Sequence, residues 1–262
     1  YASLFSGMYL ALFLVLFSLI IRGVSLEYRG KATTAAGRAW CDRGIVIGGV
    51  LPALLFGVAF ANMVRGLEMT PDHNVTSGFL YLLNPYALLG GVTMLLLCVL
   101  HGSVFLALKT RGAVRDRARL VTRSLAVPTL VAFAALVVWT VTIRGGIASA
   151  AVAATALLAL GFAVLAWFGE RDGLAFAGTA GAIALLVASW FAALFPDVLP
   201  ARGTPGNSLT ISAAASGAYT LTVMTWVAVL FTPVVLGYQA WSYWVFRRRL
   251  VGADLAGSHE TG

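Results

Sequence analysis

Charge is what this sequence has least of. Only 11% of its 262 residues are charged, whereas 60% are hydrophobic, and the mean hydropathy is +0.90. A soluble domain of this length cannot bury so much apolar surface, so the composition indicates an all-α polytopic membrane protein. The formal net charge of +8 does not indicate a nucleic-acid partner, because the basic residues fall in short segments between apolar runs.

Histidine is scarcer still. Of the three histidines, His73 and His259 lie in polar segments, and only His101 lies near an apolar run. This chain therefore cannot supply two histidines to a haem inside a helical bundle. An axial pair of His101 with Met94 or Met224 stays open, but a hydrogen-bonded histidine near a helix end is the favoured interpretation.

The remaining motifs of cofactor chemistry are absent. Cys41 and Cys98 have neither the spacing of a metal site nor that of a haem-attachment motif, which favours a structural role for both. We find no phosphate-binding loop, zinc motif or glycine-rich dinucleotide motif. The sequence therefore indicates no catalytic, cofactor-binding or metal-binding residue in this chain.

Seven apolar runs are long enough to cross a bilayer. The basic residues alternate sharply between the connections, and fifteen of the 18 lie on one side. By the positive-inside tendency that side is cytoplasmic, so the chain starts outside and its C-terminus lies in the cytoplasm. The expected spans are Phe5–Ile21, Gly44–Met63, Tyr86–Leu108, Leu125–Ile143, Ala148–Phe168, Leu174–Phe195 and Tyr219–Phe246.

The second run predicts a packed transmembrane helix. Gly49, Ala53, Gly57 and Ala61 recur at every fourth position, so they are expected to share one face of that helix. Small residues let a second helix approach closely, which is how helices associate in lipid. We therefore expect these four residues to form a close helix–helix contact.

A pair of charged residues ends the first run. Arg22 and Glu27 lie on the basic side, where a carboxylate could relay protons. Glu27 could instead pair with a nearby basic residue or be solvated. These two alternatives together are favoured over proton relay. The third run begins at Asn84-Pro85, a typical helix start in which asparagine caps the helix and proline occupies its first turn.

Six segments, in order along the chain, resemble one family: subunit II of the cytochrome bd-type quinol oxidases. The resemblance covers the whole chain and is weakest between residues 126 and 180. The segments are Phe5–Tyr9; Arg22 with Glu27–Lys31; Trp40–Gly66; Leu82–Tyr86 with Leu88–Gly91; Phe195–Pro196 with Pro200 and Ser208–Thr210; and Thr220–Ala228.

The resemblance implies a subunit of nine helices, built as two four-helix bundles plus one helix, of which this chain holds the last seven. Residues 1–124 would be the end of the first bundle and residues 125–262 the second bundle and the tail, within a single membrane domain. The chain begins with Tyr1, and we expect upstream residues that include the family's first two helices and an acidic proton-entry motif.

In this family a homologously folded subunit I holds two b-type haems and one d-type haem. Quinol is the substrate, and oxygen is reduced to water in the bacterial cell membrane. Subunit II scaffolds that partner and contributes to the proton route, and small accessory subunits can join the heterodimer. The rival hypothesis is a multispan secondary transporter, which the apolar midplane of these runs disfavours.

Overall fold

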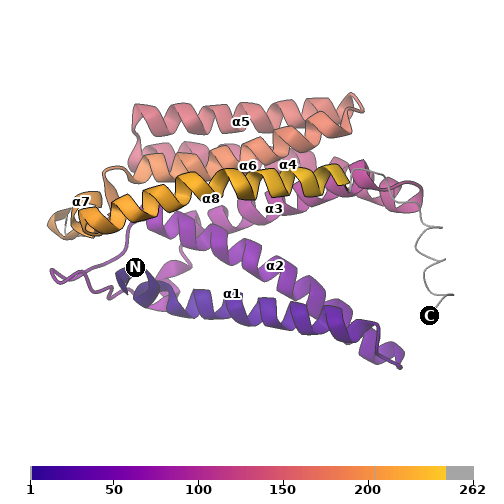
Figure 1. Ribbon diagram of the computed structural model, residues 1–262, viewed down its shortest axis with the longest axis horizontal. Helices are drawn as coiled ribbons and strands as arrows, with labels where there is room; N and C mark the ends of the chain where they lie inside the picture. The colour runs from indigo at the N-terminus through magenta and orange to yellow at the C-terminus, as the bar shows by residue number, and fades with distance from the viewer. Residues whose placement is uncertain (1, 204, 246–262) are drawn as a thin grey trace.

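The structure is a computed structural model that describes residues 2–203 and 205–245 (Figure 1). Seven of its helices are long and apolar enough to cross a membrane. The prediction of an all-α polytopic membrane protein is therefore confirmed. The last residue of the seventh expected span, Phe246, and the tail after it lie outside the described residues.

Each long helix corresponds to one expected span, and several extend well beyond it at the basic end. The first helix continues to Arg29, and the fourth begins at Ala113, twelve residues before the expected span starts at Leu125. With 32 residues, the fourth helix is about 48 Å long, so it projects beyond a hydrocarbon core of about 30 Å. The long helices are α1 (Ala2–Arg29), α2 (Ala35–Arg65), α3 (Pro85–Lys109), α4 (Ala113–Arg144), α5 (Ile147–Phe168), α6 (Asp172–Leu194) and α8 (Ala218–Val245).

One apolar core joins five of these helices. It contains Val58 of α2, Leu97 of α3, Phe133 of α4, Leu160 of α5 and Trp190 of α6, each 2% exposed or less. Helix α3 packs against α2, α4 and α6, while α1 packs against α2 (Figure 1). The core therefore crosses residue 124, where the resemblance places the boundary between two bundles, and that division stays a prediction.

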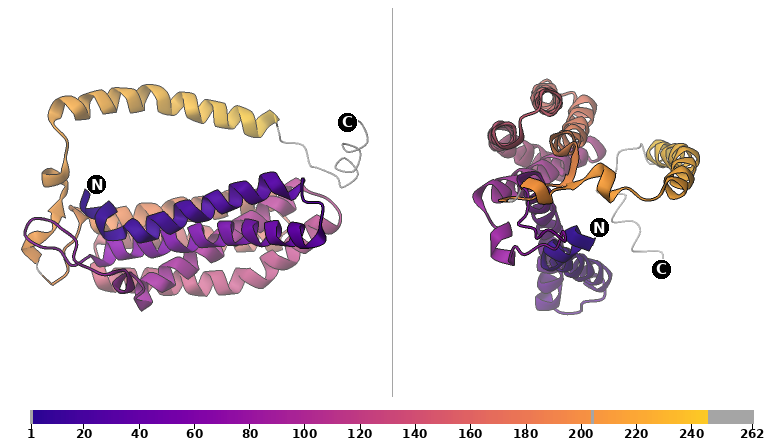
Figure 2. Two further views of the ribbon diagram at one scale, coloured as in Figure 1. Left: turned by 90° about the horizontal axis from the view of Figure 1, so that it is seen from below. Right: turned by 90° about the vertical axis from the view of Figure 1, so that its left-hand side faces the viewer.

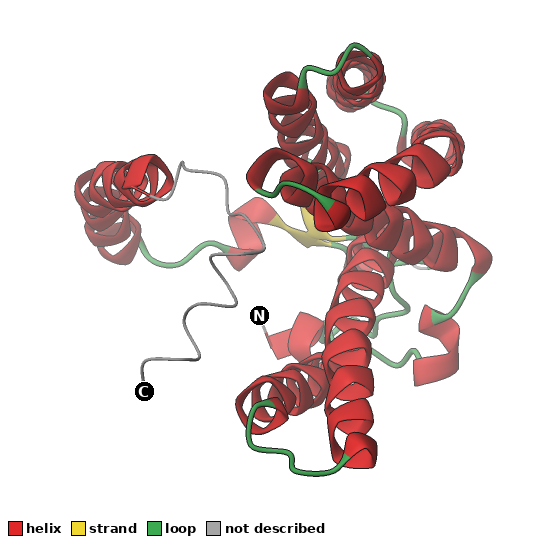
Figure 3. Cartoon of the chain, turned by 90° about the vertical axis from the view of Figure 1, so that its right-hand side faces the viewer, coloured by secondary structure: helices red, strands yellow, loops and turns green. Residues whose placement is uncertain are grey.

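Helix α8 lies apart from the other helices. Figures 2 and 3 both show it separated from the bundle, and none of its residues is buried. Whatever covers its apolar surface therefore lies outside the described part of this chain.

Short elements cover the end of the bundle opposite the basic connections. A 3-10 helix, η1 (Phe79–Leu82), precedes α3. After α6 come the antiparallel strands β1 (Asp197–Leu199) and β2 (Leu209–Thr210), the 3-10 helix η2 (Pro205–Asn207) between them, and the short helix α7 (Ile211–Ala214). A small apolar cluster holds this cover together, and it includes Met8, Leu67 and Leu199.

The start of α3 agrees with its sequence. The Asn84 side chain accepts a hydrogen bond from the Ala87 N–H at 3.0 Å, and Pro85 occupies the first helical position, so the predicted cap is confirmed. The Asn84 amide also donates to the side-chain oxygen of the fully buried Asn62 at 2.8 Å. This contact ties the end of α2 to the start of α3.

Candidate functional site

Helix α2 approaches the backbone of α3 closely at Gly57. A Cβ atom placed on Gly57 would lie 2.5 Å from the Gly90 carbonyl oxygen and 2.7 Å from the Gly91 Cα. Ala61, which is fully buried, lines the same contact, since a Cβ atom on Gly90 would lie 2.7 Å from the Ala61 Cβ. Any larger side chain at Gly57 would therefore push the two helices apart.

The other two residues of the expected stripe lie elsewhere on α2. Ala53 is half-buried, and Gly49 is exposed with no described atom within 4 Å of the place where its Cβ would be. The reason is geometric: each step of four residues turns the helix by about 40° beyond a full turn, so Gly49 and Ala61 differ by about 120°. Instead of Gly49, the buried Gly48 faces a neighbouring helix, packing against Arg22 of α1.

The two residues expected on a proton route lie at the exposed basic end of α1. The Glu27 carboxylate accepts a hydrogen bond from Lys31 Nζ at 2.6 Å, and both side chains are about two-thirds exposed. Arg22 is also exposed, and it does not pair with Glu27 in the described structure. Next to them, the Arg29 guanidinium pairs with the Asp42 carboxylate and ties α1 to α2.

His101 is held by α6. Its Nδ1 lies 2.7 Å from the Thr179 Oγ1, and its ring stacks on Phe176 with 4.7 Å between the ring centroids. The histidine therefore already has a hydrogen-bond partner on one ring nitrogen and an aromatic ring over one face.

Neither axial pair that the sequence left open for a haem fits the structure. Met94 lies two helical turns from His101 on the same helix, so the two side chains cannot bind opposite faces of one iron. Met224 is an exposed residue of the separate helix α8. No group of three or more His, Cys, Asp or Glu residues that could hold a metal occurs in the described ranges.

Asp172 is the charged residue among the buried residues of the described ranges, and it was not identified from the sequence. Asp172, the first residue of α6, is 4% exposed, and its carboxylate accepts hydrogen bonds from Arg115 at 2.8 Å and Arg119 at 3.3 Å. Arg119 also reaches Glu170 at 3.5 Å. The available signal was an aspartate in the first turn of an apolar run, opposite a connection with six basic residues.

Electrostatics explain why this cluster is stable in its position. A carboxylate in the first turn of a helix is favoured by the helix dipole, and its burial is tolerated because two guanidinium groups pair with it. The cluster connects α4 to α6 across more than 50 residues of sequence. Its evident role is to hold helices together.

The comparisons with known proteins agree with one another. Residues 1–246 match the family described as cytochrome bd terminal oxidase subunit II. The chain is 34% identical over 258 residues to the cytochrome bd ubiquinol oxidase subunit 2 of Bacillus subtilis, covering 95% of this chain and 75% of that protein.

Two relatives from other bacteria show the same similarity. The probable cytochrome oxidase subunit 2 of Haemophilus influenzae is 35% identical over 281 residues, which covers 93% of this chain and 74% of the relative. The cytochrome bd-I ubiquinol oxidase subunit 2 of Escherichia coli K12 is 32% identical over 296 residues, which covers 97% of this chain and 77% of the relative. Together with the seven apolar helices, these matches show that the chain belongs to the cytochrome bd terminal oxidase subunit II family.

Proposed function

We propose that this chain is the subunit II of a quinol-oxidising, oxygen-reducing terminal oxidase, and that its own role is to support a partner that holds the haems. The observation that carries the proposal is the family match over residues 1–246 of a chain whose described part contains seven helices long and apolar enough to cross a membrane. The names of the relatives support a quinol as the electron donor and a second oxidase subunit as the partner.

The chemistry of the described side chains supports this division of roles. Quinol oxidation and oxygen reduction need redox centres, which two b-type haems and one d-type haem would supply in subunit I. His101 Nδ1 is hydrogen-bonded to the Thr179 hydroxyl and its ring stacks on Phe176, and neither Met94 nor Met224 is placed to pair with it across an iron. The residues of this chain instead hold helices together, through the Gly57–Gly90 contact and the Asp172 cluster.

The spectrum of the assembled complex tests the proposal. Co-expression with the subunit I of the same bacterium is expected to yield a complex with the red absorption of a d-type haem and quinol-driven oxygen uptake. A colourless preparation without oxygen uptake would contradict it and favour the transporter hypothesis.

A substitution at His101 tests whether this chain ligates haem. His101→Ala removes the only described imidazole near the membrane interior but leaves the partner's ligands untouched. We expect all haem absorption bands of the assembled complex to remain. A band missing from His101→Ala but present in a matched Thr179→Val variant, which removes only the hydrogen-bond partner, would show that His101 ligates iron.

A contribution to proton uptake is a further part of the proposal. Reducing oxygen to water consumes protons, and the exposed Glu27 at the basic end of α1 supports proton pick-up there. Its pairing with Lys31 at 2.6 Å supports the structural alternative equally. Only a functional measurement on a Glu27 variant separates the two roles.

A further inference from the structure

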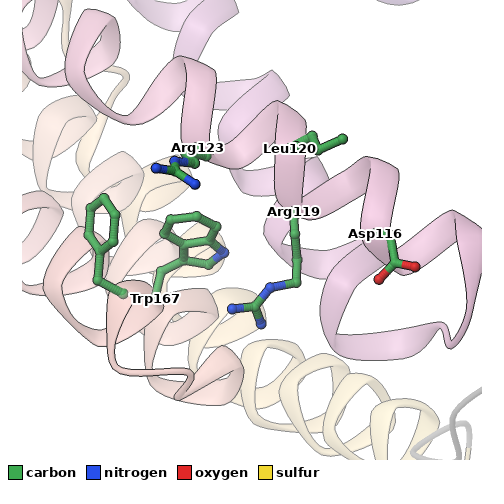
Figure 4. A pocket seen from close by; sticks show the side chains of 6 residues that line it. Asp116, Arg119, Leu120, Arg123 and Trp167 are labelled. Atoms are coloured by element: carbon green, nitrogen blue, oxygen red, sulfur yellow. The ribbon is translucent and has the colours of Figure 1, made fainter.

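An open pocket of about 540 Å³ lies between the first turns of α4 and the end of α5, at the basic end of the molecule (Figure 4). It combines basic, aromatic and aliphatic side chains. Its lining residues are Asp116, Arg119, Leu120, Arg123, Trp167 and Phe168.

The pocket has one guanidinium that is fixed and one that is free. Arg119 is held by Asp172 and Glu170, and its guanidinium carbon lies 5.5 Å from the centroid of the Trp167 ring. Arg123 lies four residues further along α4, on the same face, and is exposed. It forms no ion pair or hydrogen bond with any residue in the described ranges, so its charge is available to a ligand.

A buried donor in this pocket lacks an acceptor. Trp167 is 5% exposed, and its indole Nε1 has no hydrogen-bond partner among the described residues. Figure 4 shows this nitrogen on the side of the ring that faces Arg119. An indole N–H and a guanidinium are both donors only, so neither satisfies the other. An unpaired buried donor is costly, so an acceptor bound beside this ring would be favoured.

The position of the pocket identifies the kind of acceptor. Arg123 lies two residues before the apolar run that starts at Leu125, and Trp167 and Phe168 are the last residues of α5. Both helices thus pass through the headgroup region of a bilayer at this level. Basic clusters at this depth attract anionic lipids, and Leu120 and Phe168 offer apolar surface to an acyl chain.

One carboxylate opposes an anion in the pocket. Asp116 belongs to the lining, but Figure 4 shows it on the opposite side of Arg119 from Trp167. An anion beside Trp167 and Arg123 would therefore have Arg119 between itself and Asp116. We propose that this pocket binds the phosphate of an anionic phospholipid, held by Arg119, Arg123 and the Trp167 indole N–H. The proposal depends on membrane insertion and not on oxidase activity.

Photocrosslinking of the assembled two-subunit complex tests the proposal. The complex is placed in phosphatidylcholine nanodiscs that contain a trace of photoactivatable phosphatidylglycerol or, in a parallel sample, photoactivatable phosphatidylcholine. Crosslinks to residues 116–123 and 167–168 are then measured by mass spectrometry. We expect several times more crosslinking with the anionic probe, and about a fivefold decrease in Arg123→Gln, because one basic residue near a membrane surface has about that effect on anionic-lipid binding.

Two further variants make the test specific. Arg117→Gln removes the same charge from an exposed residue of α4 that does not line this pocket, so it should lower crosslinking clearly less than Arg123→Gln. Trp167→Phe keeps an aromatic ring but removes the N–H, and it should lower crosslinking. Equal labelling by the two probes, or an equal loss in Arg117→Gln and Arg123→Gln, would overturn the proposal. So would full displacement of the lipid by millimolar inorganic phosphate, which would indicate a site for soluble anions.

Discussion

Asp172 shows how much one residue contributes to the arrangement of these helices. It is the charged side chain among the buried residues of the described ranges, and its two arginine partners come from α4. Removing one partner of a buried ion pair is strongly destabilising because the remaining charges lose their compensation. Arg115 and Arg119 are 31% and 25% exposed, so water would screen part of that loss.

We therefore expect Asp172→Asn, which keeps the shape but removes the charge, to destabilise the complex by about 1–3 kcal/mol. The measurement is the thermal unfolding midpoint of the purified complex in detergent, which should fall. Asp116→Asn removes an exposed carboxylate near the same arginines and serves as the control. Equal midpoints for the two variants would show that the buried pair contributes nothing.

Glu27 separates a proton-carrying role from a structural one. Glu27→Gln preserves the size of the side chain but cannot carry a proton. If Glu27 conducts, quinol-driven oxygen uptake should fall severalfold while haem content and assembly stay normal. Glu68→Gln changes an exposed carboxylate at the other end of the bundle and should leave uptake unchanged.

The alternative makes a different prediction for the same variant. An exposed pair between Glu27 and Lys31 contributes at most about 1 kcal/mol to stability. Normal oxygen uptake by a fully assembled Glu27→Gln complex would exclude the proton-carrying role. The remaining role of Glu27 would be to order the connection between α1 and α2.

At the scale of an element, α2 depends on two different glycine faces. Gly44 and Gly48 face α1, whereas Gly57 faces α3 together with Ala61. Both approaches are close enough that a Cβ atom would contact a neighbouring backbone or side chain. The helix thus joins the α1–α2 hairpin to the rest of the bundle.

We expect Gly57→Leu to disturb this contact strongly, because its side chain would meet the Gly90 carbonyl. Inserting extra atoms into a packed interior typically costs about 1–3 kcal/mol. The yield of assembled complex and its unfolding midpoint should both fall. Gly49→Leu is the matched control on the same helix, since nothing described lies within 4 Å of that position. Comparable losses in both variants would mean that the effect comes from leucine in this helix and not from the α2–α3 contact.

At the scale of the whole molecule, the distribution of basic residues makes a prediction about orientation. The connections at the basic end should lie in the cytoplasm, with the β1–β2 cover outside. Single cysteines can report this in a background with Cys41 and Cys98 replaced by serine. We expect Asp72→Cys to react with a membrane-impermeant maleimide in spheroplasts.

Arg111→Cys, at the opposite end, should react only after the membrane is permeabilised. Both positions are exposed, so accessibility to the reagent differs only by the side of the membrane. The reverse pattern of labelling would show that the chain is inserted the other way round.

The sequence by itself determined the class of the protein, the seven membrane-spanning helices of the described ranges, the cap at Asn84 and its family. These properties are local, or are repeated along the chain, because apolar length and turn chemistry depend on neighbouring residues. Only the tertiary structure decided that Gly57 and Gly48 face different helices while Gly49 faces none. It also brought Asp172 to two arginines that lie more than 50 residues away. Such contacts depend on how each helix is rotated and tilted against its neighbours, and a four-residue spacing cannot specify a rotation that drifts by about 40° at every step.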